Sequence, residues 1–219
     1  LAALQSLLNT TRVAALVLTT NFQNPLGFAM PAPAKQALVA FLAAQQIPLI
    51  EDDVYAELYF ADTPPLPAKA YDQQGLVLHC GSFSKCLAPG LRVGWTVAGR
   101  YRQEVERLMF LNSLSLPTPP QLAIAKLMQR DSYQHHLKQL RHQLRSHLVL
   151  IRNVIAQSFP PGTQCSEPEG GYVIWITLPP EIDALTLYRA AINQGITVAP
   201  GTIFSRNKMF THAIRLNFS

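Results

Sequence analysis

The segment GSFSKCLAPGLRVGW, residues 81–95, places a single lysine, Lys85, at the start of a turn that contains glycine and proline. The apolar run LVLHC stands directly before this segment and is typical of a short buried strand. The hydroxyl groups of Ser82 and Ser84 precede the lysine, and Arg92 follows it. The segment therefore predicts a strand whose carboxyl end delivers a lysine together with polar and cationic neighbours.

Three segments indicate buried parallel strands, because they are short, apolar and rich in β-branched residues. They are residues 13–20, 47–53 and 76–81, and a fourth strand is predicted over 94–99. A helix is predicted over 31–46, with prolines near its start, where they are tolerated. This alternation predicts an α/β fold with a mostly parallel sheet and flanking helices.

The second half of the chain has a different pattern. Long helices come first, and a smaller α+β pattern follows. The helices are predicted over 101–114 and from about 121 to 159 with a break near Asp131–Ser132, and the α+β part comprises strand 172–178, helix 183–195 and strands 196–200 and 213–219. We therefore predict a large domain over residues 1–145 and a small C-terminal domain over 146–219. Because the chain begins in a helix-like run and stops on a strand, we expect a fragment of a longer protein.

The composition is that of a globular protein with a sizeable core. The 219 residues are 48% hydrophobic and carry a net charge of +5, so disorder is not expected. The apolar stretches are too short to span a bilayer, and the N-terminus shows no signal-peptide pattern. Cys80, Cys86 and Cys165 have no CxxC spacing, which argues against a disulfide framework or a zinc site and favours a reducing cytoplasm.

Basic residues gather between Arg100 and Arg152, which hold nine of the 18 Lys and Arg but three of the 13 Asp and Glu. Nine minus three is a local charge of +6, and the rest of the chain carries −1. Such a face can attract nucleic acid or an acidic partner, although a solvated helix face is the simpler explanation. No DNA- or RNA-binding motif accompanies the charge, so the segment alone does not support DNA readout.

No metal site is predicted. Four histidines fall on the long predicted helix, but no carboxylate joins them at metal-binding spacing. We expect a solvated helix face for these residues, which are His135, His136, His142 and His147.

Polar side chains follow each of the three predicted parallel strands. Asn24 follows the first strand, Asp52 and Tyr55 follow the second, and the segment with Lys85 follows the third. The ligand crevice of an open α/β sheet lies beyond the carboxyl ends of its strands. A lysine in such a cleft can become a nucleophile for a carbonyl, and hydroxyl groups, an arginine and turn N–H groups bind phosphate. A phosphate that carries a carbonyl and condenses with lysine suggests pyridoxal phosphate.

The pattern Asp–x–x–Tyr, then a strand, then Ser–x–Ser–Lys–x6–Arg resembles the class I/II aminotransferases of pyridoxal-phosphate fold type I. The resemblance covers nearly the whole chain, through NPLG, EDDVYAELYF, GSFSK with PGLRVGW, GGYVIW, APGTIFS and IRLNF. It implies a truncated fold type I, in which residues 1–145 are part of the large cofactor-binding domain without its N-terminal portion. Residues 146–219 would then be part of the small domain.

The resemblance also implies a role for each cofactor-binding residue. Lys85 would bond covalently to the cofactor and move the substrate α-proton, and Asp52 would pair with the pyridinium nitrogen. Which of Asp52 and Asp53 faces the ring rests on the resemblance, because both are also typical turn carboxylates. The phenolic oxygen would be bound by Asn24 and Tyr55, and the phosphate by Ser82, Ser84 and Arg92.

Three residues would bind the substrate. Arg215 would hold the substrate carboxylate in a two-pronged pair that a guanidinium suits better than an ammonium. Asn24 would contribute to the same side, and Gly171 would let the substrate approach the backbone. A plain turn residue at Asn24 and a surface ion pair at Arg215 remain alternatives.

Two functions of different classes fit this resemblance. One is the effector domain of a MocR-type GntR-family transcriptional regulator, which the wording of NPLGFAMP, IPLIEDDVYAELYF and LHCGSFSKCLAPGLRVGW favours. There an amino acid or related amine acts as the signal, the protein is a homodimer, and DNA is bound through a domain that this chain lacks. The alternative is a fragment of a free-standing aminotransferase, similar to the aminoadipate/kynurenine type.

We expect the isolated chain to bind pyridoxal phosphate weakly or not at all and to self-associate. The resemblance implies that an upstream phosphate-binding loop, an upstream aromatic residue and a second subunit complete the site. Missing strands would also leave sheet edges and apolar faces uncovered. Visible absorbance of lysine-bound cofactor in the isolated chain, abolished by Lys85→Ala, would contradict the expectation of weak binding.

Overall fold

The computed structural model describes residues 1–219 and divides the chain into two compact units. The first unit comprises residues 1–21, 30–57 and 63–137, and the second comprises 22–29, 58–62 and 138–219. The units interleave along the sequence, whereas the predicted large and small domains are continuous stretches. The assignment of residues to those two domains stays a prediction.

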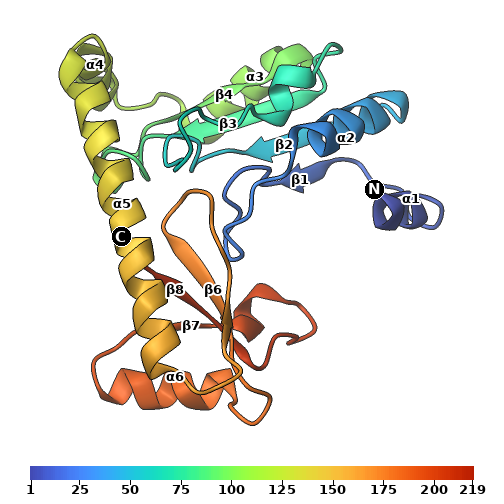
Figure 1. The fold of residues 1–219 in the computed structure, drawn as a ribbon. Coiled ribbons are helices and arrows are strands. Elements are labelled where there is room, and N and C mark those ends of the chain that lie inside the picture. The colour runs from blue at the N-terminus through green and yellow to red at the C-terminus, as the bar shows by residue number, and fades with distance from the viewer. The chain divides into compact units, whose positions relative to one another are not determined.

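The first unit is built on a four-stranded sheet in the order β1-β2-β3-β4. Its strands are β1 (Leu16–Leu18), β2 (Leu49–Asp52), β3 (Val77–Ser82) and β4 (Gly94–Val97). β1, β2 and β3 pair in parallel, and β4 adds to β3 in the antiparallel direction (Figure 1). The mostly parallel sheet predicted from the sequence is thereby confirmed.

β1 is much shorter than the predicted strand over 13–20. It lies at the edge of the sheet and pairs only with β2, from Leu16 opposite Leu49 to Leu18 opposite Glu51. Apolar composition marked a longer segment, but the length of a strand is set by the partner to which it can bond.

Helical segments fill the connections of the first unit. They are α1 (Ala2–Leu8), α2 (Ala32–Ala44), η1 (Ala68–Tyr71), η2 (Pro89–Leu91), η3 (Gly99–Tyr101), α3 (Arg102–Ser113) and α4 (Thr118–Met128). α2 begins after Pro31, close to the predicted start, and the chain turns out of it where Gln46 takes a φ of 53°. The N–H of Ile47 then donates to the Leu42 carbonyl at 3.0 Å, which directs the chain toward β2.

The longest helix, α5 (Asp131–Ser158), begins in the first unit and continues in the second. Residues 129–130 separate it from α4, close to the break predicted at Asp131–Ser132. Neither α5 nor any other helix combines the length and the apolar character that crossing a membrane requires.

The core of the first unit lies between α2 and the sheet (Figure 1). Leu38, Val39 and Leu42 of α2 pack in one buried cluster with Leu49 of β2 and Val77 of β3. Burying a side chain of this kind contributes roughly 1.5–3 kcal/mol. The packing fixes the positions of the strands whose carboxyl ends carry the predicted site.

The second unit contains an antiparallel sheet in the order β5-β6-β8-β7. Its elements are β5 (Gln164–Cys165), β6 (Val173–Thr177), α6 (Ala184–Asn193), β7 (Ala199–Pro200), η4 (Gly201–Phe204) and β8 (Ala213–Asn217). β6 is buried from Val173 to Ile176, as its unbroken apolar run predicts. Asp183 caps α6 by accepting the N–H of Thr186 at 2.8 Å. The two-residue β5 was not predicted, and β7 is shorter than the predicted strand.

Candidate functional site

The carboxyl ends of β2 and β3 lie side by side at one edge of the sheet. Asp52, the last residue of β2, stands opposite Cys80 of β3, and the N–H of Asp53 donates to the Cys80 carbonyl at 2.9 Å. Ser82, the last residue of β3, lies two positions further along. Parallel pairing therefore brings the two polar segments to the same edge, as the strand assignment predicted.

Three residues with a predicted phosphate role lie together beyond β3. The backbone N–H of Ser84 donates to Ser82 Oγ at 3.1 Å, and Arg92 Nη1 donates to Ser84 Oγ at 3.5 Å. The same Nη1 lies 3.4 Å from the Pro89 carbonyl, and Arg92 itself is exposed. A guanidinium beside two hydroxyl groups at an accessible surface is a donor set that suits a phosphate.

Two glycines allow the strands that carry this cluster to pair closely. A Cβ on Gly81 would lie 2.2 Å from the ring of Trp95, and one on Gly94 would lie 2.7 Å from the Gly81 carbonyl oxygen. Arg92, which connects the cluster to β4, has φ 53° and ψ 36°. This left-handed conformation is unusual for a residue with a side chain.

Lys85 is exposed on a turn whose flanking residues are buried. Phe83 packs against Trp95 with ring centroids 5.0 Å apart, and Cys86 is only 2% exposed. The N–H of Leu87 closes the turn by donating to the Phe83 carbonyl at 2.9 Å. Buried residues on both sides thus anchor the turn and leave the lysine amine accessible.

Two side chains near the N-terminus of α5 contact Cys86, in the turn that carries Lys85. His136 Nε2 donates to the Cys86 carbonyl at 2.8 Å, and the Tyr133 hydroxyl lies 3.8 Å from Cys86 Sγ. The predicted solvated face was therefore wrong for His136, which is half-buried. Sequence periodicity could not show this contact, because the partner carbonyl is 50 residues away in the chain.

The adjacent carboxylates Asp52 and Asp53 differ sharply in environment. Glu51 and Asp53 are buried, at 0% and 3% exposure, whereas Asp52 between them is half-buried. Alternation along an extended chain places Glu51 and Asp53 on one face and Asp52 on the other. Tyr55 is also buried, at 7% exposure. The resemblance assigned the cofactor role to Asp52, the more accessible of the two aspartates.

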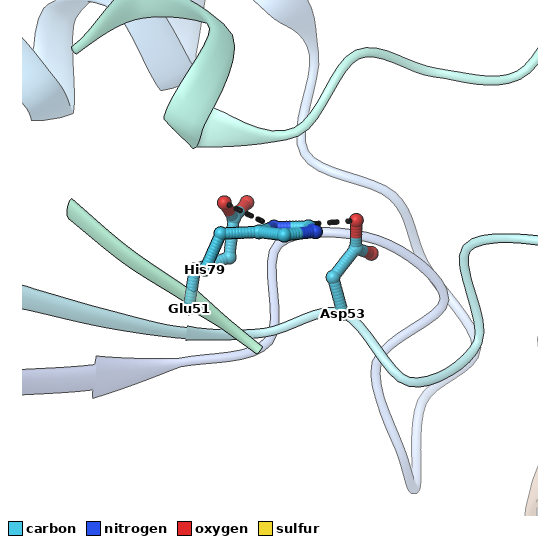
Figure 2. Close-up of side chains that lie close together, drawn as sticks. All are labelled: Glu51, Asp53 and His79. Atoms are coloured by element: carbon cyan, nitrogen blue, oxygen red, sulfur yellow. Dashed lines mark hydrogen bonds and ion pairs between the residues drawn. The ribbon is translucent and has the colours of Figure 1, made fainter. Parts of the chain in front are cut away.

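Behind Asp52 lies a buried polar cluster that sequence reasoning missed. Figure 2 shows the imidazole of His79 between the carboxylates of Glu51 and Asp53. His79 Nδ1 lies 3.2 Å from Glu51 Oε2 and 3.9 Å from Asp53 Oδ2. The alternation of Glu51 and Asp53 was a signal in the sequence, whereas the pairing of Glu51 with His79 on β3 is a strand register that only the structure shows.

Hydrogen bonds occupy most of the oxygens in this cluster. Glu51 accepts from the Thr20 hydroxyl and the Ala68 N–H through Oε1, and from the Lys69 N–H and His79 through Oε2. The ligand atoms of Glu51, Asp53 and His79 lie within 4.8 Å of one another, close enough for a metal ion. Because these oxygens already have donors, we assign the cluster as a hydrogen-bonded network and place no metal in it.

The surroundings shift the pKa values of all three groups. Burial raises the pKa of Asp53 to about 6, against a hydrogen bond from Asn21 that lowers it. The hydrogen bond to Glu51 raises the pKa of His79 above its ordinary value. Burial alone would raise the pKa of Glu51, but the hydrogen bonds from His79, Thr20 and two backbone N–H groups together lower it.

In the second unit, the structure brings Asn24 and Arg215 together across 191 positions of sequence. Arg215 Nη1 donates to Asn24 Oδ1 at 3.3 Å, and the guanidinium carbon lies 5.6 Å from the centroid of the Phe204 ring. Arg215 Nε is buried and has no hydrogen-bond partner. A buried donor without a partner costs about 1–3 kcal/mol, so this side chain suits an incoming anion. The alternative of a surface ion pair receives no support, since no carboxylate pairs with Arg215.

Gly171 is another buried residue of the second unit. It has a φ of 74°, and its N–H donates to the Leu58 carbonyl at 2.8 Å. A side chain at this φ would be strained, so glycine suits the backbone that the position requires. Its predicted substrate role stays a prediction.

The whole chain, residues 1–219, matches the family described as aminotransferase class I and II. It is 41% identical to the uncharacterised HTH-type transcriptional regulator YdcR of Escherichia coli over 99% of this chain and 46% of that protein. It is 29% identical to the aromatic-amino-acid aminotransferase 1 of Thermococcus litoralis over 90% of this chain and 48% of that protein. The chain therefore spans about half the length of the curated relatives it matches.

Among solved structures, the chain is similar to LysN, the α-aminoadipate aminotransferase of Thermus thermophilus. The TM-score is 0.91 at 28% identity, over 99% of this chain and 57% of LysN, which was solved with N-(5'-phosphopyridoxyl)-L-leucine. The kynurenine aminotransferase of Pyrococcus horikoshii gives the same TM-score of 0.91 at 28% identity, over 99% of this chain and 54% of that one. The predicted fold, a truncated fold type I, is confirmed by this likeness.

The pKa shifts of Asp53 and His79 predict that the contribution of these two groups to stability falls as the pH rises from about 4 through neutrality. A carboxyl whose folded pKa is raised favours folding while protonated, so the Asp53 contribution is lost between about pH 4 and 6. The stabilisation from His79, whose pKa is also raised, is present below its unfolded pKa and is lost as the pH passes its folded pKa. In urea unfolding, Asp53→Asn should therefore be more stable than the wild type at pH 8, by on the order of 1–3 kcal/mol, with a weaker pH dependence.

Asp72→Asn is the matched control for this measurement. Burial acts to raise the pKa of Asp72, but hydrogen bonds from Lys69 and from the N–H groups of Val77 and Leu76 lower it overall. Asp72→Asn should therefore destabilise the protein at neutral pH, opposite to Asp53→Asn. Equal effects of the two substitutions at pH 8 would show that the environment assigned to Asp53 is wrong.

Proposed function

Because the chain belongs to the aminotransferase class I and II family, we propose that it is the pyridoxal-phosphate-binding effector domain of a MocR-type GntR-family transcriptional regulator. The observation that carries the proposal is the accessible lysine Lys85 beside a phosphate-compatible cluster of Ser82, Ser84 and Arg92. The regulator assignment draws on relatives of the HTH type at 41%, 34% and 33% identity. DNA binding, dimer formation and a cytoplasmic location are proposed for the whole protein only.

The residues beyond β3 bind and orient the cofactor in this proposal. Pyridoxal phosphate, when bound, supplies an aldehyde that condenses with amines with loss of water, and a ring that withdraws electrons. Arg92 and the two serine hydroxyls hold the phosphate as charge-assisted and neutral donors. The phosphate contacts fix the ligand at the turn on which Lys85 stands.

Lys85 acts as the nucleophile and as the group that moves the substrate proton. Its turn is anchored by buried Phe83 and Cys86, so the backbone that carries the lysine is held in place while the amine remains accessible. Confinement of a reacting group in the correct geometry contributes a large part of the rate in covalent catalysis.

Asp52 is the anion for the ring nitrogen, and Asn24 and Tyr55 are the donors for the phenolic oxygen. An aspartate at this place keeps a pyridinium protonated, because an opposite charge favours the charged form. The half-buried position of Asp52 at the end of β2 supports this role, since Asp53 already bonds to Asn21 within the buried cluster.

Arg215 and Asn24 bind the carboxylate of an amino acid or related amine. Arg215 Nη1 uses one N–H on Asn24, and Nε donates to no protein group. The guanidinium therefore retains N–H donors for a carboxylate. The guanidinium lies within cation–π distance of the Phe204 ring, at 5.6 Å from its centroid. The second unit thus supplies an anion-binding group with a fixed orientation.

A free-standing aminotransferase is the second candidate. It is supported by the likeness to the aromatic-amino-acid aminotransferase of Thermococcus litoralis and to LysN. Both candidates use the same residues for the cofactor. They differ in whether the complete protein binds DNA and in whether it catalyses repeated cycles of transamination.

Substitution of the proposed cofactor residues in the complete protein tests the site. Lys85→Ala should abolish the visible absorbance of the lysine-bound cofactor, because the amine is lost. Arg92→Ala should keep the absorbance but weaken pyridoxal phosphate binding by about tenfold or more, because a charge-assisted phosphate contact is lost. Lys69→Ala removes a lysine that pairs with Asp72 and should leave both properties unchanged. Unchanged absorbance in Lys85→Ala would reject the proposal.

DNA binding and turnover distinguish the two candidates. For a regulator, we expect the complete protein to bind DNA upstream of its own gene and neighbouring genes, and an amino acid to change that binding only when pyridoxal phosphate is present. The measurement is an electrophoretic mobility shift, with Lys85→Ala as the unresponsive control. Steady transamination between an amino acid and a keto acid, with no DNA binding, would establish the alternative.

A further inference from the structure

A fully buried lysine lies behind the proposed cofactor site. Lys35 of α2 is only 1% exposed, and its Nζ donates to Asn21 Oδ1 at 2.5 Å and to the Leu66 carbonyl at 2.7 Å. An ammonium ion is costly to bury unless its protons are bonded. A lysine at a core position, where an apolar residue would be less costly, therefore indicates that its hydrogen bonds have a role in the structure.

Asn21 connects this lysine to the carboxylate of Asp53. Its amide oxygen accepts from Lys35, and its Nδ2 donates to Asp53 Oδ1 at 3.1 Å. Asn21 is 0% exposed and Asp53 is 3% exposed, so water does not replace either bond. The side-chain amide of Asn21 therefore links the ammonium of Lys35 to the carboxylate of Asp53. Only one orientation of this amide directs its oxygen to the ammonium and its nitrogen to the carboxylate.

The network joins three segments that are separate in sequence. Asn21 follows β1 and is the first residue of the NFQNP segment, Asp53 directly follows Asp52 at the end of β2, and Lys35 belongs to the packed helix α2. The network therefore ties the carboxyl ends of two neighbouring strands to one rigid element. The end of β2 carries Asp52, the residue proposed to pair with the ring nitrogen.

We propose that Lys35, Asn21 and Asp53 are positioning residues, which fix the ends of β1 and β2 so that Asp52 is held in place for the cofactor ring. The proposal rests on the proposed function, because it concerns the same site. None of the three side chains is expected to touch the cofactor. They act through the backbone to which Asp52 is attached.

Lys35→Met tests the network in the complete protein, with Lys69→Met as the matched control. Methionine keeps the length of the side chain and removes the donors. Lys35→Met should speed amide hydrogen exchange in residues 19–24 and 52–55 of the cofactor-free protein. It should also raise the dissociation constant for pyridoxal phosphate by about tenfold or more, because small displacements of positioned groups have large effects. Lys69→Met should change neither.

Exchanging the two partners of the hydrogen bond between Asn21 and Asp53 supplies a second test. This test also decides the positioning role if Lys35→Met does not fold. Asn21→Asp places a carboxylate opposite Asp53 and should weaken cofactor binding and shift the visible absorbance maximum. The double variant Asn21→Asp, Asp53→Asn restores a donor–acceptor pair in the reverse direction with the same net charge. It should recover the absorbance maximum and the affinity of the wild type.

The outcomes separate this proposal from the proposed function. A wild type without the absorbance of lysine-bound cofactor would overturn both. A wild type with that absorbance, together with Lys35→Met and Asn21→Asp proteins that bind pyridoxal phosphate as the wild type does, would overturn the positioning role alone. Failure of the double variant to recover the affinity lost in Asn21→Asp would also overturn it.

Discussion

Parallel pairing of β1, β2 and β3 is the constraint on which the proposed site depends. Because parallel strands run in one direction, every carboxyl end emerges at the same edge, and polar segments far apart in sequence meet there. The packing of α2 against β2 and β3 stabilises this arrangement through apolar burial. The apolar side chains of this core therefore hold in place the polar residues at the edge of the sheet.

The two faces of β2 at this edge serve different purposes. Asp52 is accessible to a ligand, whereas Glu51 and Asp53 enter a network with His79, Asn21 and other buried donors. A buried charge is tolerated only where hydrogen bonds compensate for the loss of water. One four-residue strand and the residue after it thus supply both the half-buried carboxylate of the proposed site and the buried polar cluster beside it.

The sequence predicted correctly those structural features that depend on residues close together in the chain. Short apolar runs located the parallel strands, and the glycine-containing segment after β3 indicated that Ser82, Ser84 and Arg92 would meet. The length of β1 and the burial of Lys35 depended on partners remote in the chain. A lysine on a predicted helix is normally solvated, and the burial of Lys35 is explained by hydrogen bonds to Asn21 and to the Leu66 carbonyl, both remote in sequence.

Arg92 combines the side chain proposed to bind phosphate with an unfavourable backbone conformation. Its φ of 53° costs about 1–2 kcal/mol in a residue that is not glycine. Glycine would relax the main chain there but would surrender the guanidinium, and a β-branched residue would lose on both counts. Position 92 is therefore a compromise between conformational ease and anion affinity, and a tightly held phosphate would offset the strain of this left-handed backbone.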